Sequence, residues 1–182
     1  MTAPACYSYK RSNHFAERID QQQMGEPVDI PQDIYNSIFR ELHMRHVDKD
    51  LLDVRRLRMI LTKLGYRSYR DHAAFILFII NGREPPIFTT EIKDQLIDMF
   101  KAIQAPFELY TPPLRKNFLN YDYILHQFCL IMNLPEHAKC FPLYRNQTKL
   151  QFHDSIWSPI CSHLSWPFNP TYQPAPDPVI NP

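Results

Sequence analysis

The residues with the clearest capacity for chemistry are two adjacent cations, Arg115 and Lys116, which follow the diproline Pro112-Pro113. Proline fixes φ, so the direction of the chain is restricted just before the cations. A helix is predicted to follow them within residues 106–133, and the backbone N–H groups at a helix start add positive potential. The pair is therefore predicted to contact a phosphate or an acidic partner. The structural alternative is pairing with the chain's own carboxylates.

Two other basic clusters invite the same interpretation. Lys10 and Arg11 stand in the basic-aromatic segment YSYKRSNHF, which we expect to be an arm that either lies on the surface of the domain or contacts nucleic acid. Arg55 and Arg56 fall at different angles of a predicted helix, as ordinary solvated charges do, but they stay candidates for the same surface. The net charge of +1 gives the whole chain no general attraction for polyanions. A nucleic-acid site therefore requires these clusters to meet on one face.

Zinc ligation has one candidate set, His137, Cys140, Cys161 and His163. These are ligand types that zinc accepts. Both cysteines stand among apolar residues, where cysteine is commonly a small buried hydrophobe. We therefore predict no metal and no cofactor.

An enzyme is not predicted either. Enzymes that cleave DNA strands use Arg, Lys, His and Tyr on the scissile phosphate, but such residues normally converge from distant parts of a chain, and Tyr121 falls on an apolar helix face. Asp122 and His126 are one helical turn apart, so their side chains can meet. Because no nucleophile accompanies them, we interpret them as a structural pair.

The elements that must position these groups are helices. The chain has 3 glycines against 17 prolines, which suits helices stopped by proline rather than hairpins closed by glycine. In the stretch 106–133, large apolar and aromatic side chains recur at three- and four-residue steps, which predicts a central helix surrounded by others. The predicted core comprises Phe118, Tyr121, Tyr123, Leu125 and Phe128 from this stretch, and Trp157 from a later helix.

The predicted fold is all-α, a single compact multi-helix domain. We expect a basic N-terminal arm over residues 1–28, a helical domain over 29–166 and an extended, proline-rich tail over 167–182. A break is expected at Pro159, with Ser158 capping a restarted turn. The other expected helices cover residues 31–46, 50–64, 68–80, 89–107 and 148–164.

The cysteine pattern and the start of the chain bound its compartment. The four cysteines form no C-x2-C pair, and the polar start offers no secretory signal, so reduced thiols in a cytosolic or nuclear setting are expected. The longest apolar run, Ala73 to Ile80, is far shorter than the roughly 20 residues that span a bilayer, and no membrane association is predicted.

The order of several motifs resembles one protein family. YKRSNHF, then GREPP, then MFKAIQAPFELYTPPLRKNFLNYDYILHQF, then CFPLYR…KL…DSIWSPIC are similar in order and spacing to the late transcription factor 3-like proteins of large DNA viruses. That family is known from poxviruses and from giant viruses of amoebae and algae. The resemblance covers Tyr9 to Phe168.

The resemblance implies a role in late viral transcription with a virus-encoded RNA polymerase or other late transcription factors, and it leaves direct DNA contact open. It places the protein in the infected host cell, in a cytoplasmic virus factory or the nucleus, or packaged in the virion. Members often carry a zinc ribbon before the first motif. Cys6 is the only cysteine near that motif here, so we expect the ribbon to be missing.

A different class of function also fits the sequence, namely a structural or assembly protein of the virion. Such a protein would dock onto a larger complex through the tail, because a proline-rich backbone is already extended and loses little entropy on binding. The sequence leaves the oligomeric state open.

Overall fold

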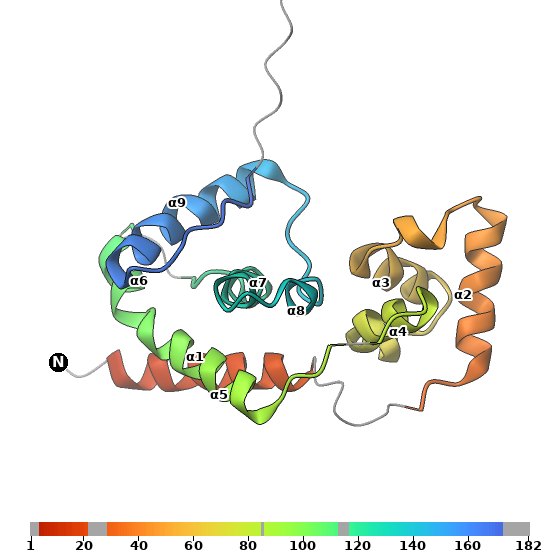
Figure 1. Ribbon diagram of the computed structural model, residues 1–182, viewed down its shortest axis with the longest axis horizontal. Coiled ribbons are helices and arrows are strands. Elements are labelled where there is room, and N and C mark those ends of the chain that lie inside the picture. The colour runs from red at the N-terminus through yellow and green to blue at the C-terminus, as the bar shows by residue number, and fades with distance from the viewer. Residues whose placement is uncertain (1–3, 22–28, 85, 113–116, 173–182) are drawn as a thin grey trace, which may run out of the picture.

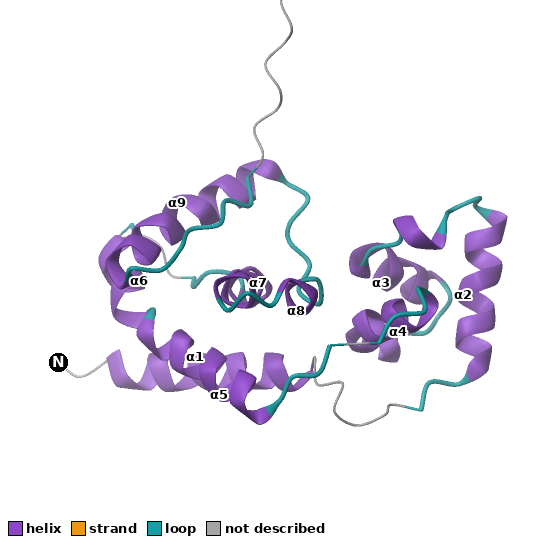
Figure 2. Ribbon diagram, viewed as in Figure 1, coloured by secondary structure: helices purple, strands orange, loops and turns teal. Residues whose placement is uncertain are grey.

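The computed structural model describes residues 4–21, 29–84, 86–112 and 117–172 and, within the first range, the side chains of residues 11–20. All regular structure in these ranges is helical, and they contain no strand, which confirms the predicted all-α fold (Figures 1 and 2). The α-helices are α1 (Pro4–Gln21), α2 (Gln32–Met44), α3 (Val54–Lys63), α4 (Ala73–Ile80), α5 (Thr90–Ala102), α6 (Gln104–Tyr110), α7 (Tyr121–Ile131), α8 (Pro135–Ala138) and α9 (Gln147–Leu164). Short 3-10 helices occur at η1 (Lys49–Leu51) and η2 (Arg67–His72).

Side-chain caps define where several of these helices begin. The side chains of Asp53, Thr89, Asn120 and Asn146 accept a backbone N–H in the first turn of α3, α5, α7 and α9. A cap of this kind stabilises a helix by about 1 kcal/mol because it satisfies a donor that has no partner inside the helix. At the other end of α3, Gly65 adopts φ +86°, as expected for a left-handed helix stop.

Helix α7 lies at the centre of one half of the molecule, between α9 on one side and α1 with α5 on the other (Figure 1). Tyr123, Leu125 and Phe128 are buried in the core. The ring centroid of Phe128 lies 5.7 Å from that of the buried Trp157. Phe118 and Tyr121 are partly buried against the same core. The helix begins only at Tyr121, so the expectation that Phe118 belongs to it is wrong; the Asn120 cap sets the later start.

The N-terminal segment is a helix of the core in the part that the structure describes. Phe15 is 0% exposed and stacks on Phe100, with ring centroids 3.9 Å apart, and Ile19, one turn later, is 1% exposed. Helices α1 and α5 run side by side (Figure 1). This corrects the expectation of an arm. The apolar face of α1 is narrow, and its many polar neighbours made the segment look like a surface segment by composition.

Helix α9 runs without interruption from Gln147 to Leu164, with Pro159 inside it. The expected break, with a restart capped by Ser158, is therefore wrong. A proline within a helix costs about 3 kcal/mol because it removes one backbone hydrogen bond and crowds the preceding turn. Burial of Trp157 and Ile160 on the same helix offsets that cost, since both are 0% exposed.

The first part of the predicted tail packs against the helices. The buried carboxylate of Asp154 accepts hydrogen bonds from the Tyr123 hydroxyl at 2.6 Å, from the Thr171 hydroxyl at 2.7 Å, and from the backbone N–H groups of Thr171 and Tyr172 at 2.8 Å. Gln127 Nε2 donates to the Asn169 carbonyl at 2.7 Å. The core therefore draws on residues on both sides of the range 29–166. The remainder of the tail, 173–182, lies outside the described residues.

Along the described ranges, no helix has both the length and the apolar character needed to cross a membrane.

Candidate nucleic-acid interface

Basic side chains gather in a hollow of about 810 Å³ that is bordered by α3, η2, the loop before α9 and the start of α9. Among the described residues, six basic side chains line it, against the single carboxylate of Asp122. The six are Arg55, Arg58, Lys63, Arg70, Arg145 and Lys149.

A second hollow, of about 390 Å³, continues this surface toward α1. It shares Arg58, Arg70 and Asp122 with the first hollow and adds Arg18 and Arg67, together with Asp71. We call the combined surface the basic groove. Its cations come from segments that are far apart in the chain, so the groove exists only in the folded protein.

The packing of α3 explains which arginines face the groove. Val54, Leu57 and Leu61 bury one side of the helix. Arg55 and Arg58 are three residues apart and therefore lie on one face, and both line the groove. Arg56 points elsewhere: its guanidinium lies 4.0 Å from the Asp53 carboxylate and donates to the Leu51 carbonyl at 3.0 Å.

Two of the groove cations are neutralised within the fold. Arg18 on α1 pairs with Asp122 on α7 at 2.6 Å, and fewer than one-fifth of each side chain is exposed. Lys63 Nζ lies 2.7 Å from the buried carboxylate of Glu41, which also pairs with Arg45. Within the described residues, no ion pair with a carboxylate is found for Arg55, Arg67, Arg70, Arg145 or Lys149. The groove therefore carries an excess of positive charge.

Arg58 lines both hollows of the groove. Its Nε donates to the Arg70 carbonyl at 3.2 Å. Burial, followed by the neighbouring Arg18 guanidinium, lowers the pKa of Arg58 from its ordinary value, although an arginine still stays charged near neutral pH. An anion bound in the groove would relieve this repulsion.

The structure places the other predicted contact residues apart from the groove or outside the described part of the chain. Arg11 lies over two aromatic rings, 5.0 Å from the Phe118 centroid and 5.8 Å from that of Phe107, and it does not line either hollow. The side chain of Lys10, and Arg115 and Lys116 as a whole, lie outside the described residues.

Several groove residues were not selected from the sequence. Arg67 with Arg70, and Arg145 with Lys149, are spaced three or four residues apart, which is the one local signal that each pair shares a face. Arg18 stands alone in a polar segment. Nothing in its local sequence indicates that it lies beside Arg58, because Arg58 comes 40 positions later in the chain, beyond α2 and η1.

The two histidines considered for zinc have other partners, and the two cysteines are buried. His137 Nε2 donates to the Ile87 carbonyl at 2.9 Å, and His163 Nδ1 lies 3.3 Å from the Tyr110 hydroxyl. Burial raises the pKa of both Cys140 and Cys161 to about 12, whereas zinc binds the thiolate. Among the described residues, no three His, Cys, Asp or Glu side chains form a group suited to a metal ion.

The predicted pairing of Asp122 with His126 is wrong. Asp122 pairs with Arg18, while His126 Nδ1 donates to the carbonyls of Ala138 at 2.9 Å and Phe141 at 3.2 Å. The two residues are one turn apart on α7, but each finds its partner on a different neighbouring segment.

A groove lined mainly by cations, on an all-helical fold, has the charge that suits a polyanionic ligand. Residues 4–168 match the family described as "Poxvirus Late Transcription Factor VLTF3 like", and the chain belongs to this family.

Its relatives come from several large DNA viruses. The chain is 48% identical to "Putative transcription factor R429" of Acanthamoeba polyphaga mimivirus, over 89% of this chain and 38% of that protein. It is 33% identical to "Putative transcription factor A494R" of Paramecium bursaria Chlorella virus 1, over 88% of this chain and 45% of that protein. The chain thus spans less than half the length of these two relatives. No solved structure matches it.

Proposed function

We propose that this chain is a non-enzymatic domain of a late viral transcription factor and that it binds the nucleic-acid backbone through the basic groove. The observation that carries the proposal is the convergence of cations from α3, η2, the loop before α9 and the start of α9 on one hollowed surface with few carboxylates. Phosphate contacts of this kind supply affinity that does not depend on sequence and fix the position of a protein on its template. The family supports the role in transcription.

The side-chain chemistry of the groove favours phosphate as its ligand. Most of its cations are arginines, whose planar guanidinium can donate two parallel hydrogen bonds to one phosphate. Lys149 Nζ lies 5.3 Å from the ring centroid of Tyr144, so an aromatic ring stands among the charges. Alternation of cations with an aromatic ring suits a ligand that carries both phosphates and bases.

The proposed biological setting follows from the family. The domain acts in the infected cell where viral genes are transcribed, and it works with the virus-encoded RNA polymerase or with other late transcription factors at late promoters. The groove holds the template, while other surfaces contact the transcription machinery. Recovery of polymerase subunits with the protein from infected cells supports this setting. Recovery of capsid or scaffold proteins instead would point to a role in virion assembly.

The groove is tested by the salt dependence of binding to DNA. The exposed cations Arg145 and Lys149 are reversed in the double variant R145E/K149E, with Lys101→Glu on α5 as an exposed control outside the groove. The native protein should bind with an affinity that falls steeply with salt, and each lost phosphate contact should reduce the logarithmic slope by about 1. The double variant should lose most binding, and the control should retain it. A flat salt response would overturn the proposal.

A further inference from the structure

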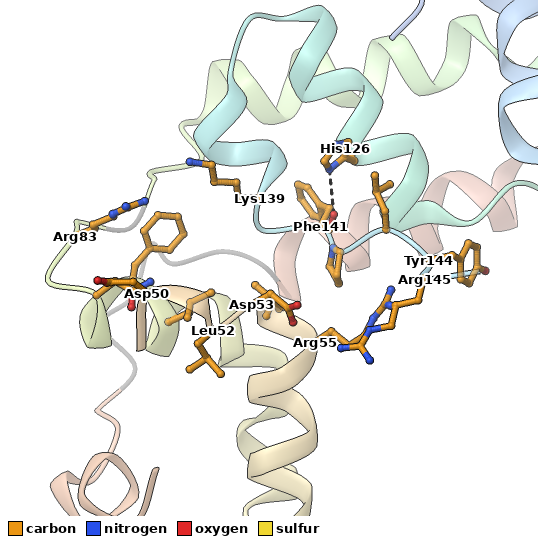
Figure 3. A pocket seen from close by; sticks show the side chains of 16 residues that line it. Asp50, Leu52, Asp53, Arg55, Arg83, His126, Lys139, Phe141, Tyr144 and Arg145 are labelled. Atoms are coloured by element: carbon orange, nitrogen blue, oxygen red, sulfur yellow. Dashed lines mark hydrogen bonds between the residues drawn. The ribbon is translucent and has the colours of Figure 1, made fainter. Parts of the chain in front are cut away.

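A third hollow, of about 500 Å³, opens beside the basic groove (Figure 3). It lies between the α3–α4 part of the molecule and the segment that follows α8. It shares Arg55, Pro142, Tyr144 and Arg145 with the basic groove, so the two are continuous. We call it the side pocket.

The side pocket has an apolar floor and a charged rim. Leu77 and Phe78 of α4 and the buried Phe141 supply apolar surface. Figure 3 shows Arg83 and Lys139 on one side of the pocket and Arg55 and Arg145 on the other. An occupant with a flat apolar body and phosphates on either side would match this arrangement.

The wall of the side pocket also offers acceptors for hydrogen bonds. The carboxylates of Asp50 and Asp53 line it, and so does Asn81, whose buried Oδ1 accepts no hydrogen bond from any residue that the structure describes. Exocyclic amino and ring N–H groups of nucleobases are donors of the kind that these atoms accept.

The pocket is held open by the fold. His126 Nδ1 donates to the carbonyls of Ala138 and Phe141, which fixes the segment that carries the floor. A volume of this size lies within the range of about 300–1,000 Å³ that is usual for pockets that bind small organic groups. A flat group can therefore enter without rearrangement of the core.

We propose that the side pocket accepts one unstacked base of a nucleic acid whose phosphates lie in the basic groove. The proposal rests on the proposed function and narrows its substrate to single-stranded or locally melted nucleic acid, because a base within an intact duplex stays stacked and paired. Tyr144, half-buried at the junction of pocket and groove, offers a ring on which the neighbouring base stacks.

The alternative occupant is an apolar side chain of an acidic partner protein. The rim cations would suit it, but an apolar side chain has no N–H group to donate to the carboxylates of Asp50 and Asp53 in the wall. The same two carboxylates accept hydrogen bonds from a base. The hydrogen-bond acceptors in the wall therefore favour the base.

The test compares two strands of equal charge, a single-stranded oligonucleotide of about 16 nucleotides and an abasic sugar-phosphate strand of the same length. The native protein should bind the base-bearing strand at least about tenfold more tightly, which is the lower part of the range for one stacked base. Leu143→Trp, which enlarges a side chain of the side pocket alone, should abolish this preference and keep the binding of the abasic strand. Lys149→Ala, in the groove alone, should weaken both strands equally.

Each result decides one of the two proposals. If neither strand binds at low salt, the proposed function fails. If the native protein binds both strands equally, the groove stands and the base pocket is overturned. The base pocket is also overturned if an acidic peptide that contains phenylalanine displaces the base-bearing strand but not the abasic strand. If the Leu143→Trp variant loses its helical circular dichroism, the Asn81→Leu variant is used in its place. Asn81→Leu removes the side-chain oxygen that accepts no hydrogen bond from any described residue of the pocket. An unchanged preference for the base-bearing strand in a folded Asn81→Leu variant would overturn the inference.

Discussion

The surroundings of Asp154 and the basic groove are two polar regions that the fold treats in opposite ways. Around Asp154, one buried carboxylate gathers donors from Tyr123, Thr171 and Tyr172, all at 2.6–2.8 Å. In the groove, Arg55 and Arg145 line a hollow without an ion pair to any described carboxylate. The carboxylate of the first region finds its hydrogen-bond donors within the chain, whereas these two guanidinium groups of the second region have no carboxylate partner among the described residues.

The difference separates polar groups that have partners within the fold from charged groups that are left available to a ligand. A buried polar group without partners costs free energy, so a fold supplies partners where the group serves stability. Cations that are held close together at a surface repel one another and do not stabilise the fold by themselves. Variants of the first region should therefore change unfolding and those of the second region should change binding, and the following expectations test this division.

The largest effect on stability is expected in the aromatic core, where Phe15 of α1 is fully buried. Phe15→Ala removes the ring stacked on Phe100 and should lower the free energy of unfolding by about 3–5 kcal/mol, because it combines lost burial with a cavity. Glu17→Ala, on the exposed side of the same helix, should change it by less than about 0.5 kcal/mol. Chemical denaturation measures both. Equal, small effects would mean that α1 is not part of the core.

Asp154→Asn should lower the free energy of unfolding by about 2–3 kcal/mol, because hydrogen bonds to a charged group are lost and an amide N–H₂ meets backbone donors. Asp98→Asn, whose carboxylate pairs with Lys101 at the exposed surface, is the matched control and should be nearly neutral. A neutral Asp154→Asn variant would contradict the account of this region as internally satisfied.

The pH dependence of stability tests a further polar group that has its partners within the fold, the partly buried His126. Burial lowers the pKa of His126, so the unfolded chain binds a proton that the folded chain does not. Stability should therefore be full above the ordinary histidine value of about 6.5 and should fall as the pH drops below it. Melting temperatures recorded across this range should show the decline, and His126→Gln should flatten it. A native melting temperature that stays constant between neutral pH and pH ~5 would refute the expectation.

Stability should fall in a second step at lower pH, and this step is assigned to Glu41. The hydrogen bond from Lys63 lowers the pKa of this carboxyl, so its contribution is present above the ordinary glutamate value of about 4.3 and is lost as the pH falls through the folded value. Glu41→Gln should remove this step and leave the step of His126 in place. Retention of both steps in the variant would assign the lower one to another carboxyl.

The smallest change in stability is expected in the groove. Arg55→Ala and Arg56→Ala alter neighbouring residues of α3, and each should change the free energy of unfolding by no more than about 0.5–1 kcal/mol. Only Arg55→Ala should lower the slope of binding against salt, by about 1, because Arg56 points toward Asp53 and away from the groove. Equal slopes for the two variants would remove Arg55 from the interface.

The sequence supported the fold class and most helix positions because these depend on local signals. The apolar periodicity of α2, α3 and α5, the Thr89 cap and the Gly65 stop are each encoded within one or two helical turns. Two expectations failed where packing outweighed a local signal. Pro159 is kept within α9 by the burial around Trp157, and α1 is fixed by Phe15 although its composition is polar.

By itself, the sequence determined that this is an all-helical member of a viral late transcription factor family, because helix periodicity and ordered motifs are properties of contiguous residues. Only the tertiary structure decided which cations lie together. Arg18, Arg58, Arg70 and Arg145 are dispersed along the chain and carry no common local signal. They share one surface because the apolar faces of α1 and α3 pack inward and leave Arg18 and Arg58 facing outward, beside Arg70 of η2 and Arg145 of the loop before α9.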